Sequence, residues 1–192
     1  MNPKIFFIGM DHSANQPLSD LMRDSGCSVA SVSSGRRNLA KTIKRNLVAG
    51  NDPLLTISDS VVYTEMTYFE NDDYIEGNQY YRQLYEAYPD AYFILNYVTE
   101  ASWLASRMSS PLLEKCQQIM VAGKPLTPRE VVWEWMTYRV QHQSTAIKWF
   151  TSDPIRNKQF LVLDVAYDDI SKLVNFVSKD YTLDSNQWMF SV

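Results

Sequence analysis

The chain has 192 residues and a mass of 22.2 kDa, the size of one domain with its own hydrophobic core. Hydrophobic residues make up 45% of it and charged residues 21%, a globular composition that excludes disordered, collagen-like and coiled-coil chains. The net charge of −4 disfavours nucleic acid as a partner, and no stretch approaches the ~20 apolar residues of a membrane span. We therefore expect a single cytoplasmic domain, residues 1–192, with no nucleic-acid or membrane partner.

The first half of the chain alternates strand and helix signals. Residues 5–8 are an apolar run that predicts a strand buried on both faces, and Pro17 lies where a helix ending at Gly26 would begin. After these come a predicted strand, a predicted helix and two short strand-like pieces, at residues 27–32, 37–49, 54–57 and 61–63. The segment from residue 51 to residue 76 gives the weakest signals.

The second half continues the alternation, with clear helix starts. Residues 80–88 predict a helix and residues 91–95 a second buried strand, after which Thr99 is suited to cap a helix that starts at residue 100. A further helix is predicted for residues 111–120. Thr127 and Glu130 form a capping-box pattern that opens a helix over residues 128–150, whose core candidates are Val132, Trp135, Val140, Ile147 and Phe150. The last elements are a buried strand at 160–163 and a helix capped by Asp168 or Asp169.

Buried strands that alternate with helices are typical of an α/β fold, a three-layer sandwich with a mainly parallel sheet flanked by helices. In such sheets ligands bind beyond the carboxyl ends of the strands. The first such corner, residues 9–16, joins a buried strand to a helix, and its backbone amides favour an anion. It lacks the second glycine and the Lys-Ser or Lys-Thr of a Walker A motif, which disfavours hydrolysis of ATP or GTP.

Three segments share the order and spacing of motifs of a known family. In residues 9–18, Gly9, Ser13 and Leu18 match a phosphosulfate-binding loop, with His12 in place of its lysine. Residues 88–96 match a strand motif that, in the family, is followed by an arginine and then a serine. In this chain Val98 occupies the position of the arginine, and Ser106 matches the serine. The aromatic helix before residues 160–164 is the third match. Together these segments resemble the sulfotransferase family, which uses 3′-phosphoadenosine 5′-phosphosulfate (PAPS).

The resemblance implies a P-loop NTPase-like sulfotransferase fold and the transfer of a sulfuryl group from PAPS to a hydroxyl of a carbohydrate or small molecule. The cofactor would be bound by Gly9, Asp11, His12, Ser13, Ala14, Asn15, Gln16 and Ser106. His12 would supply the cation that the family draws from lysine, and Glu65, after the strand-like residues 61–63, is the candidate base. The chain is short for the family, so the acceptor pocket is either open or completed by a second subunit of a homodimer.

Each candidate residue also has a plainer interpretation. His12 and Glu65 are then ordinary loop side chains, Asn15 and Gln16 are turn residues before Pro17, and Ser106 is a solvent-facing helical serine. Under that interpretation the chain is a sulfotransferase-like protein that has lost the cofactor and serves as a binding or assembly module without catalysis. A small-molecule kinase on the same fold is a third hypothesis, which the missing Walker lysine disfavours.

Other titratable residues give weaker signals. His142 lies in the middle of the long predicted helix, where a packed or exposed side chain is expected more often than a catalytic base. Arg37, Lys41 and Arg45 share one face of a predicted helix, which is either solvated or guides an anion. The two cysteines, Cys27 and Cys116, form neither a disulfide framework nor a metal-ligand pattern, so we expect no metal.

Overall fold

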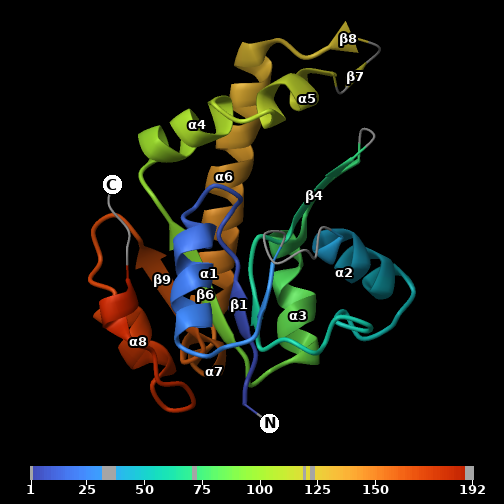
Figure 1. Ribbon diagram of the computed structural model, residues 1–192. Helices are drawn as coiled ribbons and strands as arrows, with labels where there is room; N and C mark the ends of the chain where they lie inside the picture. Colours follow the sequence, from blue (N-terminus) through green and yellow to red (C-terminus); the bar gives the residue numbers. More distant parts are fainter. Residues whose placement is uncertain (1, 32–37, 71–72, 119, 122–123, 189–192) are drawn as a thin grey trace.

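A five-stranded parallel sheet forms the centre of the protein in a computed structural model, which describes residues 2–31, 38–70, 73–118, 120–121 and 124–188 (Figure 1). In order across the sheet the strands are β2 (Val29–Ala30), β3 (Val62–Tyr63), β1 (Ile5–Phe7), β6 (Tyr92–Tyr97) and β9 (Phe160–Asp164). Every neighbouring pair is parallel. The prediction of an α/β fold with a mainly parallel sheet is therefore confirmed.

Helices cover both faces of this sheet. Ile5 and Phe7 of β1 pack on one side, and Phe6 and the following Ile8 pack on the other, so both faces of the strand are buried. The first face is covered by α1 (Asn15–Asp24) and α8 (Ser171–Val177), and the second by α2 (Leu39–Val48), α3 (Tyr81–Ala87) and α6 (Pro128–Thr151). Burial on both faces explains why the strands are apolar throughout instead of alternating.

The remaining elements lie mostly beyond the carboxyl ends of the strands. They are α4 (Glu100–Met108), α5 (Leu112–Gln118), the antiparallel pairs β4 (Thr67–Glu70) with β5 (Asp73–Glu76) and β7 (Met120–Val121) with β8 (Lys124–Pro125), α7 (Pro154–Asn157), and the 3₁₀ helices η1 (Gly77–Tyr80) and η2 (Ser185–Gln187). Figure 1 shows α6 running past the sheet toward α4 and α5. No described helix, α6 included, is long and apolar enough to cross a bilayer.

The helix starts follow the local signals in the sequence. The side chain of Thr99 accepts a hydrogen bond from the amide of Ser102, and Thr127 forms the expected reciprocal capping box with Glu130. The last helix begins one or two residues later than its predicted caps imply, at Ser171, whose amide donates to the Asp169 carboxylate at 2.7 Å. A helix cap is formed by residues a few positions apart in the chain, so these helix starts can be predicted from the sequence.

Residues 54–57 form turns, so the prediction of a strand there is wrong. Leu54 is fully buried, as an apolar strand residue would be, but the polar backbone around it is satisfied by a side chain. The Nδ2 atom of Asn46 donates to the carbonyl oxygens of Pro53 and Leu55, at 3.1 Å and 2.9 Å. A buried side-chain amide thus takes the place of a neighbouring strand.

Helix α6 buries a different face from the one its apolar residues predict. Trp135 and Phe150 are buried as expected, but Val140 is 59% exposed and Ile147 37% exposed. Between the two aromatic residues the buried positions are Arg139, His142 and Ala146. Arg139 donates to the Val98 carbonyl at 2.7 Å, and His142 Nε2 lies 2.7 Å from the Ile8 carbonyl. The polar residues face inward because they satisfy carbonyl groups where β1 and β6 end.

Two substitutions on α6 test this orientation. Phe150→Ala should lower the free energy of unfolding by about 3–5 kcal/mol, because the Phe150 ring is fully buried and stacks on Phe160 with the ring centroids 4.4 Å apart. Val140→Ala should change it by no more than about 0.5 kcal/mol. Urea unfolding followed by circular dichroism measures both; a comparable loss in the two variants would contradict the assigned inner face.

Candidate functional site

The loop between β1 and α1 lies at the carboxyl edge of the sheet and is pressed against β6. A Cβ atom at Gly9 would lie 2.0 Å from the carbonyl oxygen of Asn96 and 2.5 Å from its Oδ1 atom, so only glycine fits. The Gly9 amide donates to Asn96 Oδ1 at 3.0 Å, and its carbonyl accepts from Asn78 Nδ2 at 3.1 Å. Gly9 therefore allows the loop to pack directly against Asn96 of β6.

Buried side chains bind the carbonyl groups of this loop from inside the protein. Asn96 Nδ2 donates to the Ser13 carbonyl at 2.7 Å and to Asn15 Oδ1 at 2.8 Å. Asn15 Nδ2 in turn donates to the Met10 carbonyl at 3.1 Å, and the Trp103 indole donates to the Asp11 carbonyl at 2.8 Å. Four side-chain contacts thus fix the loop without any ligand.

The start of α1 leaves amide donors at the same edge. Ala14 is the N-cap residue and supplies no side-chain cap, so the amides of Asn15 and Gln16 have no partner within the helix. His12 and Ala14 have positive φ values of 65° and 59°, in the left-handed region that non-glycine residues rarely adopt. This backbone, followed by a helix N-terminus, is suited to binding an acceptor oxygen.

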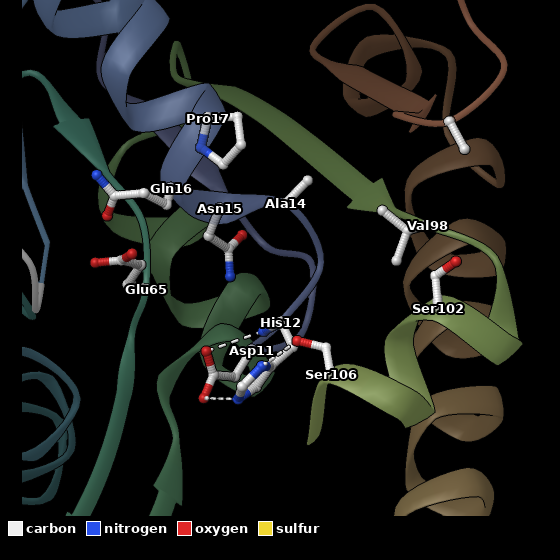
Figure 2. A pocket seen from close by; sticks show the side chains of 11 residues that line it. Asp11, His12, Ala14, Asn15, Gln16, Pro17, Glu65, Val98, Ser102 and Ser106 are labelled. Carbon is white, nitrogen blue, oxygen red and sulfur yellow. Dashed lines mark hydrogen bonds and ion pairs between the residues drawn. The ribbon is translucent and has the colours of Figure 1, made fainter. Parts of the chain in front are cut away.

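A cavity of about 480 Å³ opens over the loop, and we call it the corner cavity (Figure 2). Seven of the predicted site residues line it together: Asp11, His12, Ala14, Asn15, Gln16, Glu65 and Ser106. The other two, Gly9 and Ser13, are buried and are not part of its wall. The remaining lining residues are Pro17, Val98, Ser102 and Ala166. The structure therefore brings together the segments that follow β1, β3 and β6, the start of α1, and α4, which are far apart in the sequence.

His12 is held between Asp11 and Ser106. Its Nδ1 atom lies 2.8 Å from Ser106 Oγ, its amide donates to Asp11 Oδ1 at 2.9 Å, and its Nε2 atom lies 3.7 Å from Asp11 Oδ2. Figure 2 shows His12 with dashed contacts to both Asp11 and Ser106. Burial lowers the pKa of His12; the Asp11 carboxylate raises it, and the Arg107 guanidinium lowers it further. His12 is accordingly neutral at pH 7 and does not replace the charge of a lysine.

The charge of the corner cavity does not fit PAPS. None of the described residues that line it is a lysine or an arginine, whereas Asp11 and Glu65 are acidic. Val98 lies in the wall where the resemblance implies an arginine. PAPS carries several negative charges on its phosphates and sulfate, and the carboxylates of Asp11 and Glu65 in the wall disfavour their burial there. The amides of the α1 N-terminus are a positive feature of the described part of this wall.

A second cavity, of about 390 Å³, meets the first one. It shares Asp11, His12 and Glu65 with the corner cavity, and we call it the hairpin cavity because β4 contributes Thr67 and Phe69 to its wall. The rest of its lining comes from Ser110, Pro111, Leu112 and Lys115. Thr67 and Phe69 are not predicted at the site, because the hairpin lies in the segment with the weakest signals.

The other sequence candidates that the structure describes lie away from this wall. His142 is buried against the Ile8 carbonyl, and burial lowers its pKa while that hydrogen bond raises it. Lys41 donates to the Tyr68 hydroxyl at 3.0 Å, and Arg37 lies outside the described residues. Cys27 and Cys116 are free thiols. Within the described part of the chain, no three His, Cys, Asp or Glu side chains come together as a metal site.

No protein-family model matches the chain, and no curated protein matches it either. The resemblance to sulfotransferases therefore stays a prediction from the sequence. The geometry of the corner and the charge of its walls are the observations from which a function can be inferred.

Titration of the two histidines by NMR tests the electrostatics of the site. Both Cε1–H signals should titrate below the ordinary pKa of about 6.5, because burial penalises the imidazolium form. Asp11→Asn should lower the pKa of His12 further, since the carboxylate that raises it is removed, and should leave His142 unchanged. A rise in the pKa of His12 in this variant would contradict the assignment.

The lowered pKa values of His12 and His142 determine the direction in which pH changes the stability of the fold. The unfolded chain binds protons at these two histidines more readily than the folded protein, so their contribution destabilises the fold as the pH falls below about 6.5. Above that pH both forms are neutral and the contribution vanishes.

Proposed function

We propose that the protein is a sulfotransferase-like binding module that holds a small hydroxylated molecule at the carboxyl edge of its sheet and transfers no sulfuryl group. The charge of the corner cavity carries this proposal, because its described lining has two carboxylates and no lysine or arginine. The strand order β2-β3-β1-β6-β9, with the loop after the central strand β1, supports the sulfotransferase-like form of a P-loop NTPase-like fold.

The lining of the corner cavity suits an uncharged ligand with several hydroxyl groups, such as a carbohydrate. The carboxylates of Asp11 and Glu65 accept hydrogen bonds from hydroxyls, and the amides at the start of α1 donate to their oxygens. Pro17 and Val98 add apolar surface for the carbon skeleton. A neutral ligand of this kind avoids the repulsion that a phosphate would meet.

PAPS-dependent transfer to a hydroxyl is the second candidate function. One observation favours it: His12 and Glu65, the two candidate catalytic residues, line both the corner cavity and the hairpin cavity. A donor in one cavity and an acceptor in the other would meet at these residues, with Glu65 as the base for the acceptor hydroxyl. The charge of the corner cavity opposes this function, and for that reason we place it second.

Calorimetry with 3′-phosphoadenosine 5′-phosphate separates the two candidates. The unmodified protein should show no binding at 1 mM nucleotide, and the double variant His12→Lys, Val98→Arg should gain binding because it restores two cations to the wall. Gln16→Lys is a matched control that adds a charge at a position without a family cation. Binding by the unmodified protein would overturn the module and favour the transferase.

The ligand class has its own test, in which the two probes differ by one phosphate group. Glucose at ~10 mM should shift the NMR signals of His12 and of the Gln16 amide, whereas glucose 6-phosphate at the same concentration should shift them less, because Asp11 and Glu65 repel the phosphate. A stronger response to the phosphate would contradict the proposed preference for neutral ligands.

A further inference from the structure

A third cavity lies on the other side of α4 from the site described above. It has a volume of about 310 Å³ and shares no lining residue with the corner and hairpin cavities. Its wall contains Met10, Tyr74, Glu76, Gln79, Arg107, Cys116, Leu126, Val131, Glu134, Trp135 and Tyr138. We call it the Arg107 cavity, after the cation among its described lining residues.

Arg107 is fully buried between two tryptophans. Its Cζ atom lies 4.9 Å from the ring centroid of Trp103 on the same helix and 4.7 Å from that of Trp135 on α6. Both distances are within the range of cation–π contacts with the guanidinium. The N–H donors of Arg107 lie in the plane of the guanidinium.

One nitrogen of the guanidinium is occupied by groups from β5. Nη2 donates to the Tyr74 hydroxyl and lies 3.4 Å from Glu76 Oε1, and the Tyr74 hydroxyl also hydrogen-bonds to Glu76. Glu76 is 3% exposed, and Thr67 donates to its other oxygen at 3.2 Å. Glu76 therefore balances the charge of Arg107 locally.

The other nitrogens of the guanidinium have no partner. Nε and Nη1 of Arg107 are buried without a hydrogen bond among the described residues, and so is the hydroxyl of Tyr138, which lines the same cavity. Buried polar groups of folded proteins are nearly always paired, because leaving one unpaired is costly. Arg107 and Tyr138, on α4 and α6, both line this one cavity. Their unpaired atoms are closed to solvent, so an acceptor from outside the chain would reach them only where the side chains over them shift aside.

We propose that the Arg107 cavity binds a small, uncharged, largely apolar molecule that carries a carbonyl oxygen. The oxygen accepts from Arg107 and from the Tyr138 hydroxyl, and the apolar part packs against Met10, Val131 and Trp135. A neutral ligand is favoured over an anion because Glu76 already balances Arg107, and Glu134 adds a further negative charge to the wall. A cation offers no acceptor to the free donors.

Three probes of one shape test the ligand class: benzamide, benzoate and benzylamine. In ¹H–¹⁵N spectra, benzamide should shift the signals of Arg107 Nε–H and Trp135 Nε1–H with a Kd on the order of 1 mM, as is typical of so small a ligand. Benzoate should bind at least about fivefold more weakly, and benzylamine should leave the Arg107 signal in place. No shift of Arg107 with benzamide, or tighter binding of benzoate or benzylamine, overturns the proposal.

Tyr138→Phe is the decisive variant, because replacing Arg107 risks unfolding the protein. Removing an unpaired buried hydroxyl should leave the free energy of unfolding unchanged or raise it, while the affinity for benzamide falls about fivefold. Val140→Ala, on the exposed face of the same helix, is the matched control and should change neither quantity. Native-like benzamide affinity in Tyr138→Phe overturns the proposal.

Discussion

The side chain of Asn96 is the contact on which the architecture of the carboxyl edge depends. It is fully buried at the end of β6, and its amide accepts from Gly9 and donates to both Ser13 and Asn15. A buried amide with all these partners joins the central pair of strands to the start of α1. The close approach that makes this possible requires a glycine at position 9, so backbone sterics and hydrogen bonding select the same geometry. The corner cavity lies above this fixed floor.

Buried polar and aromatic side chains from α4 and α6 hold the next layer above the sheet. Trp135, Arg107, Trp103 and Arg139 form one stack, in which each cation lies within 4.9 Å of a neighbouring indole centroid. Arg139 also binds the Val98 carbonyl, and Trp103 binds the Asp11 carbonyl. The two helices therefore pack through groups that also anchor the loop after β1 and the end of β6. This coupling explains why α6 turns arginine and histidine inward and leaves Val140 exposed.

The parts of the fold that depend on local signals could be predicted, and those that depend on distant partners could not. Residues 5–8 and 160–163 indicate buried strands by composition alone, and Thr127 with Glu130 fixes the start of a helix between neighbours. The topological rule for parallel sheets predicts a site at residues 9–16, and five of these residues line the corner cavity; Ser106, which lines it too, is predicted only from the resemblance to sulfotransferases. Nothing near Arg107 in the sequence shows that it will meet Trp135 and Glu76, because these contacts arise only when α6 and β5 pack on α4. The hairpin cavity could not be predicted either, because its wall forms only when β4 and residues 110–115 come together with the loop after β1.

The distribution of cations among the described residues is the main support for the proposed function. Arg107 acts electrostatically on the corner cavity, because its charge lowers the pKa of His12. Its guanidinium is committed to two indole rings and to Glu76, and it lines a separate cavity. The positive charge of Arg107 is therefore directed away from the loop, where it lowers the pKa of His12 instead of neutralising a phosphate. A corner with neutral His12, two carboxylates and a valine in its wall favours an uncharged ligand over a phosphosulfate.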